Sequence, residues 1–210
     1  MLKRTATERA ADPRPDDDDR SPEELVEYFI GAFTREGDTV FDPFAGYGTT
    51  LLVSERMGRA AWGVELDEGR AGHARSRLAD PSHLIVGDAL RLSSYDLPPF
   101  DLLLTSPPFM AREETVNPLG RIPRPAAGYD SYIDELRAVF EESSSFMKPG
   151  ARAVIEVANI KTERSVTTLA WDIGAAVSEA LEFQGEIVIC REEPLFGYDH
   201  GYCLVFGGRI

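Results

Sequence analysis

The chain has 210 residues, enough for one domain with a full hydrophobic core, and its 43% hydrophobic content argues against a wholly disordered chain. Its two cysteines are too few for a disulfide framework or a four-cysteine zinc site. No apolar run approaches the roughly 20 residues of a membrane helix, so we expect a cytoplasmic protein without a membrane partner. The net charge of −14 argues against a general nucleic-acid coat protein, although not against an enzyme with a local basic patch.

Residues 1–20 are predicted to be a disordered acidic tail, because their run of four aspartates repels itself and nothing apolar is available for burial. Residues 21–210 are predicted to form a single domain. Its first helix is expected to begin with Ser21 as N-cap, followed by the Pro-Glu-Glu of a capping box, and to run to about Thr34.

Short apolar runs then alternate with helical stretches. The predicted strands are 39–42, 61–65, 84–86, 101–105, 152–157, 186–190 and 202–206, and the predicted helices are 48–57, 68–78, 132–147 and 166–183. This alternation indicates an α/β, Rossmann-like fold with a seven-stranded, mostly parallel sheet and helices on both faces. The last two strands lack a helix between them and are expected to pair antiparallel at one edge. Trp171 and both cysteines, Cys190 and Cys203, are expected in the core.

A glycine-containing loop follows the first predicted strand and opens a helix: Asp42-Pro43-Phe44-Ala45-Gly46-Tyr47-Gly48-Thr49-Thr50. Its glycines allow close backbone approach to a ligand at the carboxyl end of a parallel strand, although a glycine pair alone would equally fit an ordinary turn. No Gly-Lys-Ser/Thr follows, which excludes a P-loop. The second strand ends at Glu65, about 20 residues on, where a carboxylate can bind ribose hydroxyls. The third strand is followed by Asp88, so three successive strand ends carry an acid.

The fourth predicted strand runs into Thr105-Ser106-Pro107-Pro108-Phe109, which by itself would also fit a buried strand with a rigid exit. An amine on an aromatic base is a poor nucleophile, because its lone pair is delocalised into the ring. The Ser106 hydroxyl and the Pro107 carbonyl can accept both amine hydrogens and aim the lone pair at a methyl group. Pro108 keeps that carbonyl rigid, and Phe109 offers a face for stacking a flipped base.

Residues 21–109 resemble the S-adenosylmethionine-dependent methyltransferases that modify exocyclic amines of DNA bases, through the DPFAGYGTT, GVELD, GDA and TSPPF motifs. The resemblance implies the class I methyltransferase fold, S-adenosylmethionine as cofactor and DNA in preference to RNA as substrate. It places Asp42 near the methionine ammonium, Glu65 on the ribose and Asp88 at the adenine amino group. No metal site is predicted. The implied cofactor-binding residues are Asp42, Phe44, Ala45, Gly46, Gly48, Thr49, Thr50, Glu65, Leu66, Asp88, Ala89 and Thr105.

The TSPPF motif especially resembles that of cytosine-N4 enzymes, because adenine-N6 enzymes and guanine-N2 RNA enzymes more often carry Asp or Asn at the position of Ser106. Those two targets stay open, as do a small-molecule N-methyltransferase and a cofactor-binding subunit that lacks its recognition partner. Methylation at carbon 5 is not expected, since it needs a cysteine nucleophile in a catalytic turn.

Members of this kind usually add a target-recognition domain, for which the chain has no room. Residues 110–130 are the one stretch long enough to act as a substrate loop. Arg112, Arg121 and Arg124 in that stretch are expected to bind the substrate. We therefore expect a nucleic-acid partner and either a specificity subunit or a homodimer.

Overall fold

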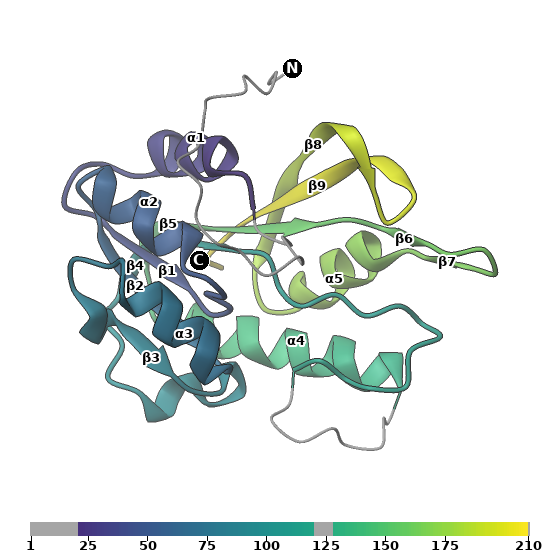
Figure 1. Cartoon of the computed structure of the whole chain (residues 1–210), viewed down its shortest axis with the longest axis horizontal. Helices are drawn as coiled ribbons and strands as arrows, with labels where there is room; N and C mark the ends of the chain where they lie inside the picture. Colours follow the sequence, from purple (N-terminus) through teal and green to yellow (C-terminus); the bar gives the residue numbers. More distant parts are fainter. Residues whose placement is uncertain (1–20, 120–127, 210) are drawn as a thin grey trace.

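The computed structural model describes residues 21–119 and 128–209, with the exception of the side chain of Glu193 (Figure 1). Its main sheet has seven strands in the order β3-β2-β1-β4-β5-β9-β8, and all pairs are parallel except those that β9 makes with β5 and β8. The predicted α/β fold and its antiparallel edge are confirmed. The predicted tail, residues 1–20, lies outside the described residues.

The strands and helices follow the predicted order. The main sheet consists of β1 (Thr39–Asp42), β2 (Ala60–Glu65), β3 (Leu84–Val86), β4 (Phe100–Thr105), β5 (Met147–Val157), β8 (Glu182–Leu195) and β9 (Tyr198–Gly207). The helices are α1 (Glu23–Phe33), α2 (Thr49–Arg56), α3 (Glu68–Arg75), α4 (Tyr129–Ser144) and α5 (Leu169–Val177), with the 3-10 turns η1 (Pro81–His83) and η2 (Ala89–Ser94). A separate hairpin pairs β6 (Ile160–Lys161) with β7 (Val166–Thr167).

The strand order reverses at β1. From β1 the chain proceeds outward through β2 to β3, and it then returns to β4 on the other side of β1. Loops that leave the carboxyl ends of β1 and β4 therefore diverge, and such a reversal leaves a crevice between them where ligands bind in open α/β sheets. The glycine-containing loop and the TSPPF turn are the two loops at this position.

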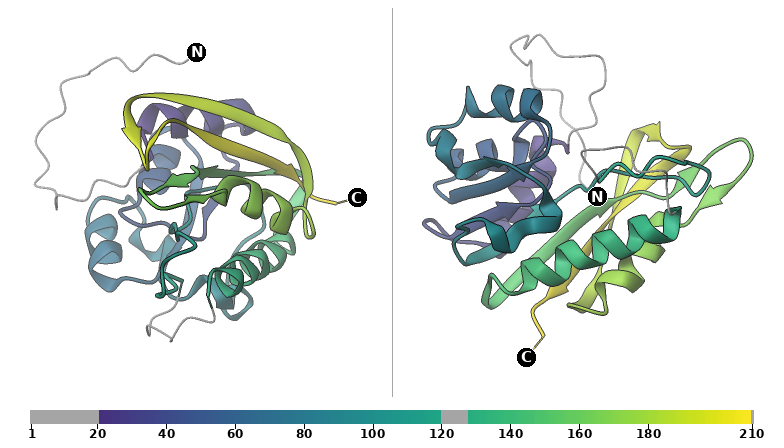
Figure 2. Two further views of the ribbon diagram at one scale, coloured as in Figure 1. Left: turned by 90° about the vertical axis from the view of Figure 1, so that its right-hand side faces the viewer. Right: turned by 90° about the horizontal axis from the view of Figure 1, so that it is seen from below.

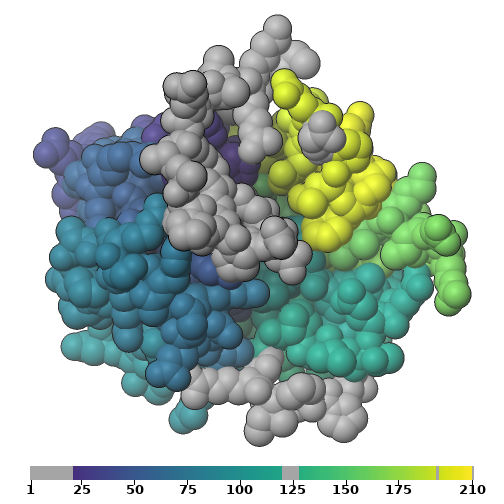
Figure 3. Space-filling view, in the orientation of Figure 1, coloured from purple at the N-terminus to yellow at the C-terminus, as the bar shows by residue number. Residues whose placement is uncertain are grey.

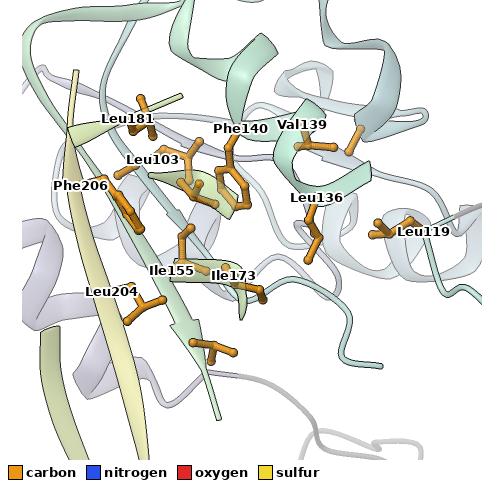
Figure 4. Close-up of a cluster of buried hydrophobic side chains, with 14 of the residues drawn as sticks. Leu103, Leu119, Leu136, Val139, Phe140, Ile155, Ile173, Leu181, Leu204 and Phe206 are labelled. Carbon is orange, nitrogen blue, oxygen red and sulfur yellow. The ribbon is translucent and has the colours of Figure 1, made fainter. Parts of the chain in front are cut away.

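Helices cover both faces of the sheet. On one face, α1 and α2 pack against apolar side chains of β1, β4, β5 and β9. On the other face, α4 and α5 bury large residues of the same strands, and Figure 2 shows α4 lying alongside β5 and β9. Figure 4 shows part of this second core, in which Phe140 and Leu136 of α4 face Leu103, Ile155 and Phe206 of the sheet.

The predicted N-cap of α1 is wrong. Pro22 occupies the capping position, and its carbonyl accepts hydrogen bonds from the Leu25 and Val26 amides. This places Ser21 one residue outside the helix, where its hydroxyl donates to the buried carboxylate of Glu156 on β5. Ser21 therefore fastens the start of α1 to the middle of the sheet.

The predicted helix 166–183 is shorter in the structure, because the β-branched Val166 and Thr167 pair with β6 instead. The prediction that Trp171 lies in the core is also wrong. Leu169, Ile173 and Val177 form the buried stripe of α5, and Trp171 lies off that stripe with 48% exposure, its ring 4.9 Å from that of Tyr202.

The two cysteines differ in their surroundings. Cys203 lies in the core, as expected, and burial raises the pKa of its thiol. Cys190 is exposed, contrary to expectation, because β8 is the edge strand of the sheet.

Helix α3 packs through the small side chains of Ala71 and Ala74, and glycines lie at two close contacts nearby. Gly48, at the start of α2, has a φ of 83°, and a Cβ added there would lie 2.8 Å from Cβ of Ala74 on α3. A Cβ added at Gly63 of β2 would similarly lie 3.0 Å from Cβ of Ala45. The two glycines therefore let α3 pack closely on the start of α2, and the glycine-containing loop pack closely on β2.

We expect Gly48→Ala to destabilise the protein more than Gly37→Ala. Both glycines have a left-handed φ, which costs an alanine about 1–2 kcal/mol. Gly37 has no atom within 4 Å of an added Cβ, whereas the contact with Ala74 should add about 1–3 kcal/mol of overpacking. The free energy of unfolding in urea checks this, and equal losses in the two variants would contradict the packing argument.

Candidate active site

A cavity of about 940 Å³ lies at the carboxyl edge of the sheet, within the size range of ligand pockets. Loops that follow β1, β2, β3 and β4 line it, as the topology predicts. Nine of the twelve expected cofactor-binding residues line the cavity, namely Asp42, Phe44, Ala45, Gly46, Thr49, Thr50, Glu65, Leu66 and Ala89. All four residues of the expected catalytic turn, Ser106–Phe109, line the same cavity.

Asp42 ends β1 with its carboxylate buried at the cavity wall, 4% exposed. Its Oδ1 accepts hydrogen bonds from the Thr105 hydroxyl at 2.6 Å and from the Phe44 amide at 3.0 Å. Burial nevertheless raises the pKa of Asp42 to about 6, and the charge of Glu65 adds to the rise. The ionised form therefore lacks a countercharge that a cationic group in the cavity would supply.

Glu65 ends β2 and is held by backbone amides rather than by a cation. One carboxylate oxygen accepts from the Gly46 amide at 2.7 Å, and the other accepts from the Asp67 amide at 2.8 Å. These bonds tie the glycine-containing loop, where Gly46 has a φ of 54°, to the neighbouring strand end. A carboxylate has about four acceptor sites, so about two remain for ligand hydroxyls.

Three expected cofactor residues do not line the cavity but support residues that do. Gly48 packs on α3, and Thr105 donates its hydroxyl hydrogen to Asp42. Asp88 caps the turn η2, where its Oδ1 accepts from the Leu90 amide at 2.9 Å. Its neighbours on both sides, Gly87 and Ala89, do line the cavity.

Tyr95 supports the Asp88 loop from behind, a contact that the sequence does not reveal. The Tyr95 hydroxyl accepts from the Asp88 amide at 2.7 Å. Gly87 lies directly on it, since an added Cβ would be 2.3 Å from the hydroxyl oxygen. Glycine at this position is therefore required by the tyrosine rather than by the cavity.

The turn after β4 presents two unused acceptors. Within the described residues, neither the Ser106 hydroxyl nor the Pro107 carbonyl has a hydrogen-bond partner, and both residues line the cavity. The next carbonyl, that of Pro108, differs because it accepts from the Tyr132 hydroxyl at 2.7 Å. The turn thus offers two neighbouring oxygen atoms to a ligand while its third is engaged by the protein.

Phe109 meets a second aromatic ring that sequence reasoning missed. Phe196 lies in the tight turn between β8 and β9, lines the cavity, and has its ring centroid 5.3 Å from that of Phe109 at an interplanar angle of 61°. Its φ of 52° is the one positive value at a non-glycine position among the described residues, and the Lys161 amide donates to its carbonyl at 2.8 Å. Figure 3 shows the strands that carry it, in yellow, beside the green β6–β7 hairpin.

The three arginines expected to bind substrate are not brought together at the cavity. Arg112 pairs with Asp172 at 2.8 Å, and its guanidinium lies 4.6 Å from the ring centre of Tyr129. It therefore joins its loop to α4 and α5 instead of lining the cavity. Arg121 and Arg124 lie outside the described residues. The basic residue that does line the cavity is Arg70, on α3.

The described residues hold no group of three or more His, Cys, Asp or Glu side chains suited to a metal ion. Across residues 21–119 and 128–209, no helix has the length and apolar character to cross a membrane.

Known DNA methyltransferase sequences are similar to part of this chain. A family model described as DNA methylase, of the N6/N4 type, matches residues 15–75. The Type II methyltransferase M2.DpnII of Streptococcus pneumoniae is 44% identical over 59 residues, which cover 28% of this chain and 22% of that protein. M.BamHI of Bacillus amyloliquefaciens is 40% identical over 63 residues, which cover 30% of this chain and 15% of that protein. The matches thus span about a fifth of these relatives or less.

Solved structures resemble nearly the whole chain. TrmN from Thermus thermophilus gives a TM-score of 0.64 over 89% of this chain and 49% of its own, at 18% identity. A TehB-like SAM-dependent methyltransferase from Corynebacterium glutamicum gives 0.59 over 88% of this chain and 87% of its own, also at 18% identity. At such low identity these likenesses establish the fold. The chain therefore resembles N6/N4-type DNA methylases over residues 15–75, and it has the class I fold of S-adenosylmethionine-dependent methyltransferases.

Proposed function

We propose that the protein transfers a methyl group from S-adenosylmethionine to an exocyclic amine of a nucleic-acid base, with cytosine N4 in DNA as the target. The observation that carries this proposal is the pair of unused acceptors, the Ser106 hydroxyl and the Pro107 carbonyl, in the same cavity as the buried Asp42 carboxylate. One part of the cavity is suited to a cationic cofactor and the other to an amine.

The residues of the cofactor part fit S-adenosylmethionine, whose sulfonium supplies an activated methyl group when it is bound. Asp42 would hold the ammonium of the methionine portion, since a cation compensates the charge that burial disfavours. Glu65 would accept hydrogen bonds from the ribose through its remaining acceptor sites. Asp88 would face the adenine amino group from the loop that Tyr95 supports.

The residues of the amine part would hold and activate the target base. The Ser106 hydroxyl and the Pro107 carbonyl would accept hydrogen bonds from the two amine hydrogens, which draws the nitrogen toward tetrahedral geometry and exposes its lone pair. Once the nitrogen has gained the methyl group, one of these hydrogens leaves as a proton to solvent. Phe109 and Phe196 provide aromatic faces for a base taken out of its stack. Because the acceptors are fixed before the base arrives, little reorganisation accompanies the reaction.

Nucleoside mass spectrometry tests the proposal and its target. The protein is incubated with methyl-labelled cofactor and, separately, DNA, RNA and free nucleosides, and the products are digested and identified. We expect labelled N4-methylcytosine from DNA. Labelled N6-methyladenine would retain the reaction and change the base, whereas label only in RNA or free nucleosides would change the substrate class. Cofactor binding without label in any pool would favour a subunit that requires a recognition partner.

Asp42→Asn should stabilise the protein without cofactor at high pH. The folded-state pKa is raised above the ordinary 3.8, so the ionised carboxylate disfavours the fold above about pH 6, and this effect disappears as the pH falls through 6 toward 4. The difference from 3.8 to about 6 corresponds to an advantage of up to about 3 kcal/mol for the variant at pH 8. Urea unfolding of both proteins at pH 8 and pH 4 measures it.

The same substitution should weaken cofactor binding and remove its pH dependence. Neutral Asp42 cannot attract the ammonium, so the wild-type Kd should rise by up to about tenfold per pH unit below 6. Asp42→Asn should bind about 10–100-fold more weakly at pH 8, through loss of a charge-assisted hydrogen bond. Asp38→Asn removes a half-buried carboxylate just before the same strand and serves as the control in calorimetry. An Asp42→Asn variant that binds like the wild type would refute this role.

Ser106→Ala should lower turnover and leave the Kd for cofactor unchanged, because the hydroxyl acts on the amine. Loss of one preorganised contact costs on the order of 10²–10³ in rate at comparable sites. Ser144→Ala is the matched control, since that hydroxyl bonds only within α4, to the Glu141 carbonyl. Single-turnover methylation at saturating cofactor separates the two effects, and full turnover in Ser106→Ala would remove the amine-activating role.

A further inference from the structure

The turn that carries the two free acceptors cannot be held by its own amides. Pro107 and Pro108 have no N–H group, so two successive positions can donate nothing to the backbone around them. Outside the strand ladder, the hydrogen bond from the Tyr132 hydroxyl to the Pro108 carbonyl is the one such bond to Ser106–Phe109 within the described residues. The position of the turn therefore depends on a residue 24 positions further along the chain.

The surroundings of Tyr132 favour this hydrogen bond. It lies in the first turn of α4 with 0% exposure, between the helix and the residues of the second core. Burial raises the pKa of its hydroxyl, and the nearby charge of Glu114 raises it further, so the group keeps its proton and donates. Within the described residues, the Tyr132 hydroxyl makes no other hydrogen bond.

The geometry of the turn shows what the contact controls. Each proline ring fixes its own φ, and Pro108 also restricts ψ of Pro107, so the Pro107 carbonyl has one narrow orientation relative to the two rings. The remaining freedom is at the Pro108–Phe109 peptide. The carbonyl of that peptide is the atom that Tyr132 holds, and its amide belongs to Phe109. Rotation of this peptide would move the Phe109 ring and the acceptors relative to each other.

We propose that Tyr132 is a positioning residue for methyl transfer, one whose hydroxyl fixes the Pro108–Phe109 peptide and thereby aligns the amine acceptors with the stacking ring. This inference rests on the proposed function for its consequence in catalysis, but the contact itself is testable without activity. Tyr132 does not line the cavity and is expected to act only through the turn.

The first test observes the Pro108 carbonyl directly. The sequence contains three Pro–Phe pairs, Pro43–Phe44, Pro99–Phe100 and Pro108–Phe109. Protein labelled with carbonyl-¹³C proline and ¹⁵N phenylalanine therefore gives three peaks in an HNCO spectrum. In Tyr132→Phe we expect the Pro108–Phe109 peak alone to shift or broaden. An unchanged peak would overturn the contact, and movement of all three peaks would show a role in the fold rather than in the turn.

Tyr129→Phe is the matched control for the spectrum. It removes a tyrosine hydroxyl from the same helix turn, but that hydroxyl donates to Asp172 at 2.8 Å and not to the TSPPF turn. All three Pro–Phe peaks should keep their wild-type positions. Movement of the Pro108–Phe109 peak in this variant would mean that any loosening of α4 reaches the turn, which would also overturn the specific role of Tyr132.

The second test is a double-mutant cycle in single-turnover methylation. Tyr132→Phe should lower turnover by about 10–100-fold, as misplacement of reacting groups does, with the Kd for cofactor unchanged. In that background Ser106→Ala should cost much less than it does alone, because the hydroxyl is already misaligned. A full, additive penalty would overturn the positioning role. A wild-type protein that methylates no base would refute the proposed function, while the spectrum would still decide the contact.

Discussion

The hydrogen bond from Thr105 to Asp42 connects the carboxyl ends of β4 and β1, the two strands between which the sheet reverses direction. The glycine-containing loop leaves one of these strands and the TSPPF turn leaves the other. The parallel pairing of β1 with β4 and this buried side-chain hydrogen bond together fix the separation of the two loops. In the proposed function, this fixed separation would bring a methyl donor on one loop and an amine on the other within reach of each other.

Hydrogen bonds compensate the charge of Glu65 at the cavity, but they do not fully compensate that of Asp42. Glu65 is satisfied by backbone amides, so it holds the loop whether or not a ligand is present. Asp42 is buried beyond what its hydrogen bonds compensate, which is why its pKa is about 6. One carboxylate thus maintains the shape of the site, and the other stores unfavourable charge that a cation relieves. In the proposed function, the positive charge of the cofactor would compensate the Asp42 carboxylate, whose burial lowers the stability of the protein without ligand.

Local sequence patterns were sufficient for the parts of the molecule whose causes are local. Apolar runs that end in Asp42, Glu65 or the TSPPF turn predicted both the strands and the residues that line the cavity. The failures involve distant partners. Ser21 has the right neighbours for an N-cap but bonds to Glu156, and Tyr132 and Phe196 reach the TSPPF turn from elements later in the chain. Those contacts depend on packing of the whole sheet, which no short pattern encodes.

The cluster around α2 and α3 should respond to substitutions differently from the core under α4 and α5. Between α2, α3 and β2 the cluster combines three leucines with Ala45, Ala61, Ala71 and Ala74, and it leaves no room for a Cβ at Gly48 or Gly63. Under α4 and α5 the packing consists of large rings and leucines such as Phe140 and Leu136. Replacement by a larger residue should therefore be the damaging change in the cluster around α3. Replacement by a smaller residue should be the damaging change under α4 and α5, next to the TSPPF turn. Natural variants should accordingly avoid larger residues at the alanines and glycines around α3, and avoid smaller residues at the large side chains under α4 and α5.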